Sequence, residues 1–170
     1  ADRRIAGEWN TLPKDYVLYA IKYINPWHGA YLRRGIDNVQ GKSGNTSLDT
    51  TVIYHEEYVE NDEVCNAVTQ SLNEISISLL ALNKDKSRIP FELILNFDEN
   101  GNCTIGKSNG VSYSISGNGE FVKDGDMWGG EEQDVLYLNY TVDFETTTHS
   151  FTDTLVIRNR GIEFETFNPV

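Results

Sequence analysis

The residue types best suited to ligand contact are concentrated between Ile24 and Gly35, a stretch with a tryptophan, a histidine, a tyrosine and two adjacent arginines. Aromatic rings stack on the apolar CH faces of sugars, and polar side chains such as His can hydrogen-bond sugar hydroxyls. Trp27, His28 and Tyr31 are therefore candidate ligand-binding residues. The alternative is structural, with Trp27 closing one end of a barrel and Tyr31 in its core, because buried aromatic residues outnumber ligand-binding ones.

A fourth candidate is Trp128, in the acidic and glycine-rich segment Lys123–Asp134. This composition predicts a long loop, and loops carry a large share of binding residues. Glycines beside the ring leave little neighbouring chain to bury it, which favours an exposed aromatic side chain. The alternative is that Trp128 folds back over the mouth of a barrel.

Paired carboxylates occur at Glu56-Glu57 and Glu131-Glu132, and pairs of carboxylates catalyse glycoside hydrolysis. Neighbouring residues of a strand point to opposite faces, however, whereas the two catalytic carboxyl groups must face each other across one bond. The sequence also holds no nucleophile and base in a recognisable arrangement. We therefore expect no enzymatic activity and no cofactor.

Metal-ligand spacing is also missing from the sequence. His28, His55 and His149 show none of the spacings typical of zinc sites. Asp98–Asn102 resembles the start of a calcium loop, but Asn109 stands where the twelfth-position glutamate is needed. A hairpin turn is the simpler interpretation, and no metal site is predicted.

The chain is acidic, with 26 Asp and Glu against 14 Lys and Arg, a net charge of −12 and a pI near 4.6. Such a surface repels phosphate backbones and anionic lipid headgroups, which argues against nucleic-acid partners and electrostatic membrane binding. Cys65 and Cys103 are the only cysteines. Two buried free thiols are predicted, with a disulfide as the alternative in an oxidising compartment.

Alternation of apolar with polar or β-branched residues predicts strands along most of the chain. Residues 61–74 are ambiguous, because Val64, Val68 and Leu72 lie four apart, as on a helix; we assign them to a strand. Residues 38–47 have the composition of a surface loop. The other predicted strands are 15–25, 50–59, 75–82, 89–97, 136–144 and 151–159.

Turn signals separate these strands. Asn100-Gly101, Asn109-Gly110 and Gly117–Gly119 predict hairpin turns, since glycine and asparagine tolerate positive φ. Pro26 ends the first predicted strand, and the glycines after it predict that residues 26–35 form a corner between two strands. Strand alternation places the adjacent Arg33 and Arg34 on opposite faces.

About 8–10 short antiparallel strands at this spacing predict an all-β fold, a meander β-barrel in which neighbours in sequence pair in space. Closure of the barrel removes edges that would otherwise promote aggregation. We expect residues 1–14 to be a junction from a missing N-terminal segment and residues 15–170 to be a single barrel domain.

Four stretches, Tyr16–Gly35, Gln70–Asn73, Phe97–Cys103 and Asp153–Gly161, carry a family resemblance. On these residues the chain resembles the C-terminal domain of a group of uncharacterised surface lipoproteins from gut anaerobes, encoded beside polysaccharide-uptake systems. The resemblance implies a location in the cell envelope, on the outer membrane or facing the periplasm, through a lipid anchor in the missing N-terminal segment. It implies no catalytic residues.

More distantly the pattern is similar to lipocalins and other calycins, in which a basic residue near the last strand covers a Gly-x-aromatic motif near the first. Gly29-Ala30-Tyr31 or Gly7-Glu8-Trp9 would supply that motif here. Arg158 or Arg160 would supply the basic residue. This resemblance implies a lipocalin-like barrel.

The resulting functional hypothesis is a non-catalytic accessory domain of a cell-surface lipoprotein that aids glycan binding or uptake. Its expected partners are a glycan and neighbouring outer-membrane uptake proteins. Two alternatives stay open: a calycin-type carrier with a small apolar ligand inside the barrel, and a structural module that docks another protein. A cavity inside the barrel would favour the carrier, and a filled core would count against it.

Overall fold

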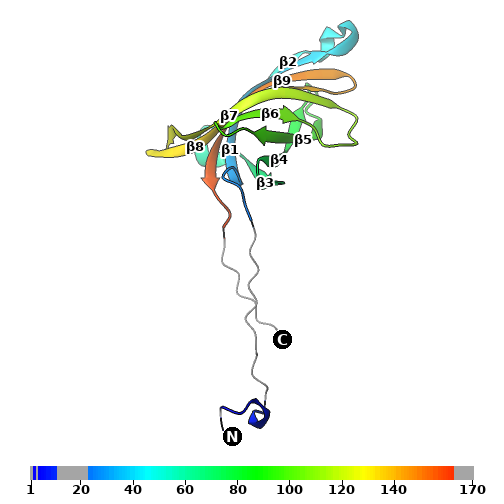
Figure 1. Cartoon of the computed structure of the whole chain (residues 1–170). Helices are drawn as coiled ribbons and strands as arrows, with labels where there is room; N and C mark the ends of the chain where they lie inside the picture. Colours follow the sequence, from blue (N-terminus) through cyan, green and yellow to red (C-terminus); the bar gives the residue numbers. More distant parts are fainter. Residues whose placement is uncertain (1, 3, 11–22, 163–170) are drawn as a thin grey trace.

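The computed structural model describes residues 2, 4–10 and 23–162. The strands among residues 29–159 form an all-β antiparallel barrel (Figure 1). The helical elements among these residues are short 3-10 turns, η1 (Ala6–Glu8), η2 (Lys42–Gly44), η3 (Thr46–Leu48) and η4 (Val59–Asn61). None of the described residues forms a helix of the length and apolarity that a membrane span requires. The strands are β1 (Gly29–Gly41), β2 (Thr50–Tyr54), β3 (Glu63–Thr69), β4 (Glu74–Leu82), β5 (Arg88–Phe97), β6 (Asn102–Gly106), β7 (Ser114–Trp128), β8 (Glu131–Asp143) and β9 (Thr147–Asn159).

The barrel is a meander that β1 closes. From β3 to β9 every strand pairs antiparallel with the next one in sequence. One edge of β1 pairs with β9 over residues 30–41, which we call the closed seam. The other edge pairs with β3 through residues 29–33 and with β2 through residues 35–39. Eight strands thus form the ring and β2 is a ninth beside it, which confirms the predicted antiparallel meander barrel.

The ring is weakest between β3 and β4, a boundary that we call the loose seam. Only three residue pairs join these strands, between residues 67–69 and residues 75–77. Beyond them β4 continues to Leu82, paired with β5 alone. A hydrogen bond from the Tyr54 hydroxyl to the Leu80 carbonyl, 3.3 Å long, bridges part of this gap. Within the described residues, both β2 and the end of β4 therefore keep one edge without a strand partner.

Apolar side chains from the ring strands fill much of the interior. Fully burying one such side chain contributes roughly 1.5–3 kcal/mol, so this core supplies the main stabilisation of the barrel. The alternation predicted for residues 136–144 is confirmed. Both cysteines are buried free thiols, as predicted. The side chains without exposed surface include Tyr31, Ile75, Ile77, Leu93, Leu95, Leu136, Leu138 and Leu155.

The prediction of a corner at residues 26–35 is wrong, because β1 runs without interruption from Gly29 to Gly41. β1 also includes residues 38–41, the start of the predicted loop 38–47. The inward positions of β1 include Arg33, Gly35 and Asp37, so the apolar alternation that marks the other strands is absent there. Most of the first predicted strand, residues 15–22, lies outside the described residues, and residues 23–25 are not in a strand.

The predicted loop Lys123–Asp134 is also wrong. β7 and β8 continue through it as a long hairpin, with Gly129 and Gly130 at the turn, where both have positive φ. A register shift between Val122 and Asp126 interrupts the ladder. Both arms of this hairpin project from the barrel and are mostly polar, so apolar alternation could not reveal them.

Among the shorter elements, the strand assignment for residues 61–74 is confirmed over residues 63–69 by β3, whereas residues 70–73 connect it to β4. The predicted 50–59 strand ends earlier, at Tyr54. The Asn100-Gly101 turn is confirmed, with a φ of 86° at Gly101. A turn at Gly117–Gly119 is wrong, because these residues lie inside β7. A Cβ atom at Gly117 would lie 2.4 Å from the Asn139 carbonyl oxygen, so glycine here permits close approach of β8.

Candidate functional site

Trp27 and Tyr31 form a plug at one end of the barrel. The Trp27 ring is half-buried and stacks on Phe97, with centroids 4.0 Å apart and an interplanar angle of 8°. Tyr31 is fully buried and its hydroxyl donates a 2.8 Å hydrogen bond to the Trp27 carbonyl. Burial raises the pKa of the Tyr31 hydroxyl well above its usual value. Both aromatic residues therefore have clear structural roles.

His28 lies next to this plug and is half-buried. Its Nδ1 atom accepts a 3.2 Å hydrogen bond from the Thr69 amide. Arg160 crosses the same region and donates hydrogen bonds to the carbonyls of Pro26 and His28, and a further one to Asp134. A basic residue after the last strand thus covers the start of the first, as the lipocalin resemblance implies.

Trp128 lies on the outer wall of the barrel, against β1. Its ring packs under Arg34, whose guanidinium carbon is 4.8 Å from the ring centroid, and its Nε1 donates to Asp126 at 3.0 Å. Arg34 also donates to Asp62. The tip of the β7–β8 hairpin therefore contacts the outer wall through Trp128, whereas the alternative interpretation placed Trp128 over the mouth of the barrel. The structure brings Trp27 and Tyr31 together but gives Trp128 different partners.

A buried ionic cluster that the sequence did not reveal lies inside the barrel, around Arg33. Its Nε donates to Asp153 at 3.1 Å, and its Nη1 donates to Glu63 at 3.1 Å. The Tyr140 hydroxyl donates to Asp153 at 2.6 Å, and the Arg33 guanidinium lies 3.9 Å from the centroid of the Tyr54 ring. The signal available in the sequence was the pair of adjacent arginines, one of which has to point inward.

The surroundings favour a charged Arg33 and protonated tyrosines, whereas burial raises the pKa of Asp153 against the opposing charge of Arg33. Burial alone would lower the pKa of Arg33. The negative charge of Asp153 beside it acts in the opposite direction and, with the other neighbouring groups, outweighs burial, so the pKa of Arg33 is raised. Burial, followed by the charge of Asp153, raises the pKa of Tyr140. Burial raises the pKa of Tyr54 to about 12. The cluster thus stabilises the closed seam without offering a nucleophile.

In a second buried polar group, a carboxylate, a histidine and a hydroxyl are connected in the order found in a catalytic triad. The His149 Nδ1 lies 2.7 Å from Asp37, and its Nε2 lies 3.1 Å from the Thr147 hydroxyl. Thr147 is only 2% exposed, so a substrate cannot reach its hydroxyl in this conformation. We interpret the group as a buried polar network of the barrel interior, in which Asp37 Oδ1 has no hydrogen-bond partner. Among the described residues, no three or more His, Cys, Asp or Glu side chains gather as metal ligands would.

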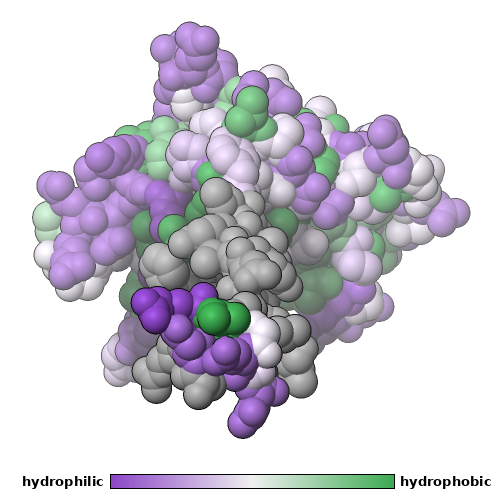
Figure 2. All heavy atoms as spheres, turned by 60° about the horizontal axis from the view of Figure 1, so that its bottom comes forward, coloured by the Kyte–Doolittle hydropathy of each residue, from purple (hydrophilic) through white to green (hydrophobic). Residues whose placement is uncertain are grey.

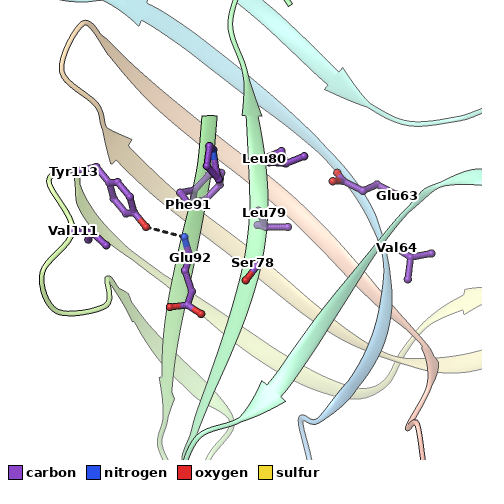
Figure 3. Close-up of a pocket in the computed structure, with 10 residues that line it drawn as sticks. Glu63, Val64, Ser78, Leu79, Leu80, Phe91, Glu92, Val111 and Tyr113 are labelled. Atoms are coloured by element: carbon purple, nitrogen blue, oxygen red, sulfur yellow. Dashed lines mark hydrogen bonds between the residues drawn. The ribbon is translucent and has the colours of Figure 1, made fainter. Parts of the chain in front are cut away.

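The most suitable ligand site is a groove of about 510 Å³ on the outside of the barrel, which we call the outer groove (Figure 3). β4 and β5 form its floor, through the more exposed Ser78, Leu80, Pro90 and Glu92 and the buried core residues Leu79 and Phe91. The segment before β7 and the start of β3 flank it (Figure 3). It therefore extends along the loose seam. Its lining residues are Glu63, Val64, Ser78, Leu79, Leu80, Pro90, Phe91, Glu92, Val111 and Tyr113.

The chemistry of the outer groove is amphipathic and acidic. Two carboxylates, Glu63 and Glu92, line it together with apolar side chains, and none of the ten lining residues is Lys or Arg. Glu63 is already paired with Arg33 of the buried cluster, at 3.1 Å. Glu92 accepts a hydrogen bond from Ser108, and its backbone amide donates to the Tyr113 hydroxyl at 3.0 Å. None of the four candidates from the sequence lines this groove, and its members come from separate strands.

With this geometry established, the comparisons give the family. Residues 26–161 match the family described as "Domain of unknown function (DUF5627)". The chain belongs to the DUF5627 family. It is also similar to a crystal structure of a protein of unknown function from Bacteroides ovatus, with 39% sequence identity and a TM-score of 0.82. That match covers 93% of this chain and 50% of the Bacteroides ovatus chain. A comparison with curated proteins found no match.

Proposed function

We propose that the DUF5627 domain is a non-catalytic domain that binds neutral glycans in the outer groove, as part of a cell-surface lipoprotein. The observation that carries this proposal is a groove of about 510 Å³ that combines apolar side chains with two carboxylates, of which Glu63 is paired with Arg33 and Glu92 forms no salt bridge within the described part of the chain. Carboxylate oxygens accept hydrogen bonds from sugar hydroxyls, and apolar side chains contact the CH faces of the ring.

Charge favours neutral glycans over acidic ones. The chain carries a net charge of −12, and the groove itself adds Glu92, together with Glu63, whose charge Arg33 partly offsets, to the surface that meets the ligand. Uronic or sulfated sugars would place a like charge beside these carboxylates, which opposes binding. Neutral hexose polymers meet no such repulsion.

The packing supports the groove rather than the barrel interior as the ligand site. A calycin-type carrier of an apolar ligand needs interior volume, whereas apolar side chains from the ring strands fill much of the interior described here. The charged cluster at Arg33 and Asp153 would also oppose an apolar ligand, because it offers charged groups where apolar contacts are needed.

The four residues suggested by the sequence contribute less to the proposal. Trp27 and Tyr31 form the plug, and the Trp128 ring packs against the Arg34 guanidinium. Replacing Trp27 would disturb the fold and the ligand site alike, so it is a poor test of binding.

On the face seen in Figure 2, coloured hydrophilic residues predominate and hydrophobic ones form small separate spots, with no broad apolar patch among the coloured atoms.

Affinity electrophoresis against neutral and acidic polysaccharides tests the proposal. We expect at least one neutral polysaccharide to retard the native protein. Ser78→Tyr, which places a ring in the groove, should abolish the retardation, and Glu92→Gln should weaken binding about tenfold through loss of a charged hydrogen bond. Ser150→Tyr, on an exposed outward position of β9, is the matched control and should leave retardation unchanged.

Two results would contradict the proposal: no retardation by any polysaccharide, or equal retardation of the native protein and the Ser78→Tyr variant. Location is tested separately. Protease treatment of intact cells should degrade a surface lipoprotein and spare a protein enclosed by the outer membrane. Resistance in intact cells, with degradation after lysis, would remove the surface assignment. The similarity to a Bacteroides ovatus protein supports a bacterial context but gives no location.

A further inference from the structure

A second site lies at the free edge of β2, away from the outer groove. β2 pairs with β1 alone, so its opposite edge has no strand partner among the described residues. A pocket of about 430 Å³ separates this edge from the turn between β4 and β5. The pocket shares no lining residue with the outer groove. Its lining residues are Thr50, Thr51, Val52, Ile53, Leu82, Asn83, Lys84, Lys86 and Arg88.

The wall opposite β2 is basic. Lys84, Lys86 and Arg88 are exposed, and none of them forms a salt bridge within the described part of the chain. The same turn holds Asp85, which bonds the Ser87 amide and hydroxyl, so residues 83–88 carry three cations and one carboxylate, a net charge of +2. In a chain of net charge −12 this is a local reversal of sign.

The backbone beside this basic wall can accept another strand. An edge strand presents unpaired N–H and C=O groups, which form a template for a further extended chain. The end of β4, residues 78–82, lacks a partner on the side of β2 as well. Ile53 is 69% exposed on β2, an apolar contact for an incoming side chain.

An alternative explanation is that the lysines only protect the edge, since charged residues beside an edge strand commonly prevent aggregation. Protection of the edge and binding of a partner concern incoming segments of opposite charge. Cations repel basic segments and attract acidic ones, so the same residues that exclude an arbitrary strand select an acidic one. Charge complementarity thus determines the kind of partner that fits.

We propose that an extended, acidic peptide segment of a partner protein adds to the free edge of β2 as an additional antiparallel or parallel strand. Its backbone bonds β2 along five residues, and its acidic side chains pair with Lys84, Lys86 and Arg88. Five residues of extended chain span roughly 16 Å, the length of a short recognition motif. This inference does not depend on glycan binding, because it uses different residues.

Fluorescence anisotropy with a labelled eight-residue peptide of alternating valine and glutamate tests the proposal. We expect saturable binding that weakens as salt increases. A peptide with lysine in place of glutamate should not bind. The glutamate peptide with N-methyl groups on alternate amides should lose most of its affinity if the backbone ladder forms. On binding, exchange of the Thr50–Tyr54 amides should slow.

Charge reversal in the protein separates a built site from general electrostatic attraction. The triple variant Lys84→Glu, Lys86→Glu and Arg88→Glu should bind the glutamate peptide at least tenfold more weakly. The matched control reverses three exposed cations elsewhere, Lys107→Glu, Lys123→Glu and Arg158→Glu, and should change affinity less than twofold. Failure of the glutamate peptide to bind, equal binding of its N-methylated form, or equal losses in both triple variants would overturn the proposal.

Discussion

The two edges of β1 show how differently one barrel can be joined. At the closed seam, twelve residues of β1 pair with β9, and the buried cluster of Arg33 and Asp153 links the same strands through their side chains. At the other edge, β1 divides its pairing between β2 and β3, and the next boundary, between β3 and β4, has three pairs. Stability is concentrated at the first edge, and both proposed binding sites lie beside the second.

Loss of Arg33 should have the largest effect on this contrast. Arg33→Ala leaves Asp153 and Tyr140 buried without their cation, and breaking a buried pair in this way costs about 3–5 kcal/mol. Urea unfolding followed by tryptophan fluorescence measures the loss. Arg34→Ala is the matched control at the neighbouring position. Its partner Asp62 is buried but keeps a hydrogen bond from the Glu56 amide, and the Arg34 side chain is partly exposed, so the loss should be smaller.

The double variant Arg33→Met with Asp153→Leu keeps the volume of the pair but removes its charges. We expect it to recover much of the stability lost in Arg33→Ala, since a well-packed apolar pair can replace a buried ion pair. An Arg33→Ala protein as stable as Arg34→Ala would contradict the role given to the closed seam.

Gly35 gives the next largest effect, at the same seam. A Cβ atom at this position would lie 1.9 Å from the Asp153 carboxylate and 2.7 Å from the Thr152 carbonyl oxygen. Gly35→Ala should therefore cost about 1–3 kcal/mol through forced displacement of packed groups. Gly106→Ala is the control, because nothing lies within 4 Å of its added Cβ atom. Equal urea midpoints for the two variants would show that the β1–β9 contact is looser than described.

The same contrast explains how much of the fold the sequence could predict. β4, β5, β8 and β9 line an apolar interior, so their alternation gave the barrel class and most strand positions. The pattern did not predict β1 as one strand, because its inward face carries Arg33, Gly35 and Asp37. The charged side chains of Arg33 and Asp37 find their hydrogen-bond partners only far away in the sequence. Local pattern cannot report a partner 120 residues away, such as Asp153 for Arg33.

The candidate site was less predictable than the fold. Trp27, His28, Tyr31 and Trp128 drew attention by residue type, yet Trp27 and Tyr31 form a plug and Trp128 packs on Arg34. The outer groove uses ordinary residue types from separate strands, and its shape depends on where β3 leaves β4. Strand divergence of this kind is a property of the whole barrel, so no short segment of sequence encodes it.

Amide hydrogen exchange compares the two edges of β1 directly. We expect the amides of β2 that bond to β1 to exchange at least tenfold faster than those of β9 that bond to β1, a difference of about 1.4 kcal/mol in opening free energy. β1 is the common partner, so the comparison isolates the flanking strand. Equal protection on both edges would mean that β2 opens only with the whole barrel. That result would contradict the expectation that β2 separates from β1 more easily than β9 does.

The two cysteines give the smallest and most local comparison. Burial raises the pKa of both thiols to about 12, so at pH 8 the folded protein holds them protonated and unreactive. Cys65 lies in β3 at the loose seam, whereas Cys103 lies in β6 between two paired neighbours. In the single-thiol variants Cys103→Ala and Cys65→Ala, we expect iodoacetamide to label Cys65 about threefold to tenfold faster than Cys103, because opening of β3 from β4 exposes Cys65 alone.

The pH dependence of labelling tests whether opening is required. An exposed thiol has a pKa of about 8.5, so labelling through an open state rises with pH to about 9 and then levels off. Direct attack by the folded thiols would continue to rise toward pH 12, where they ionise. Because the folded pKa is the higher one, the thiols stabilise the fold fully below pH 8.5 and lose that contribution as the pH rises toward 12. The loss accelerates opening at high pH, so the plateau has to be measured at pH 9–10, while urea midpoints still match those at pH 8.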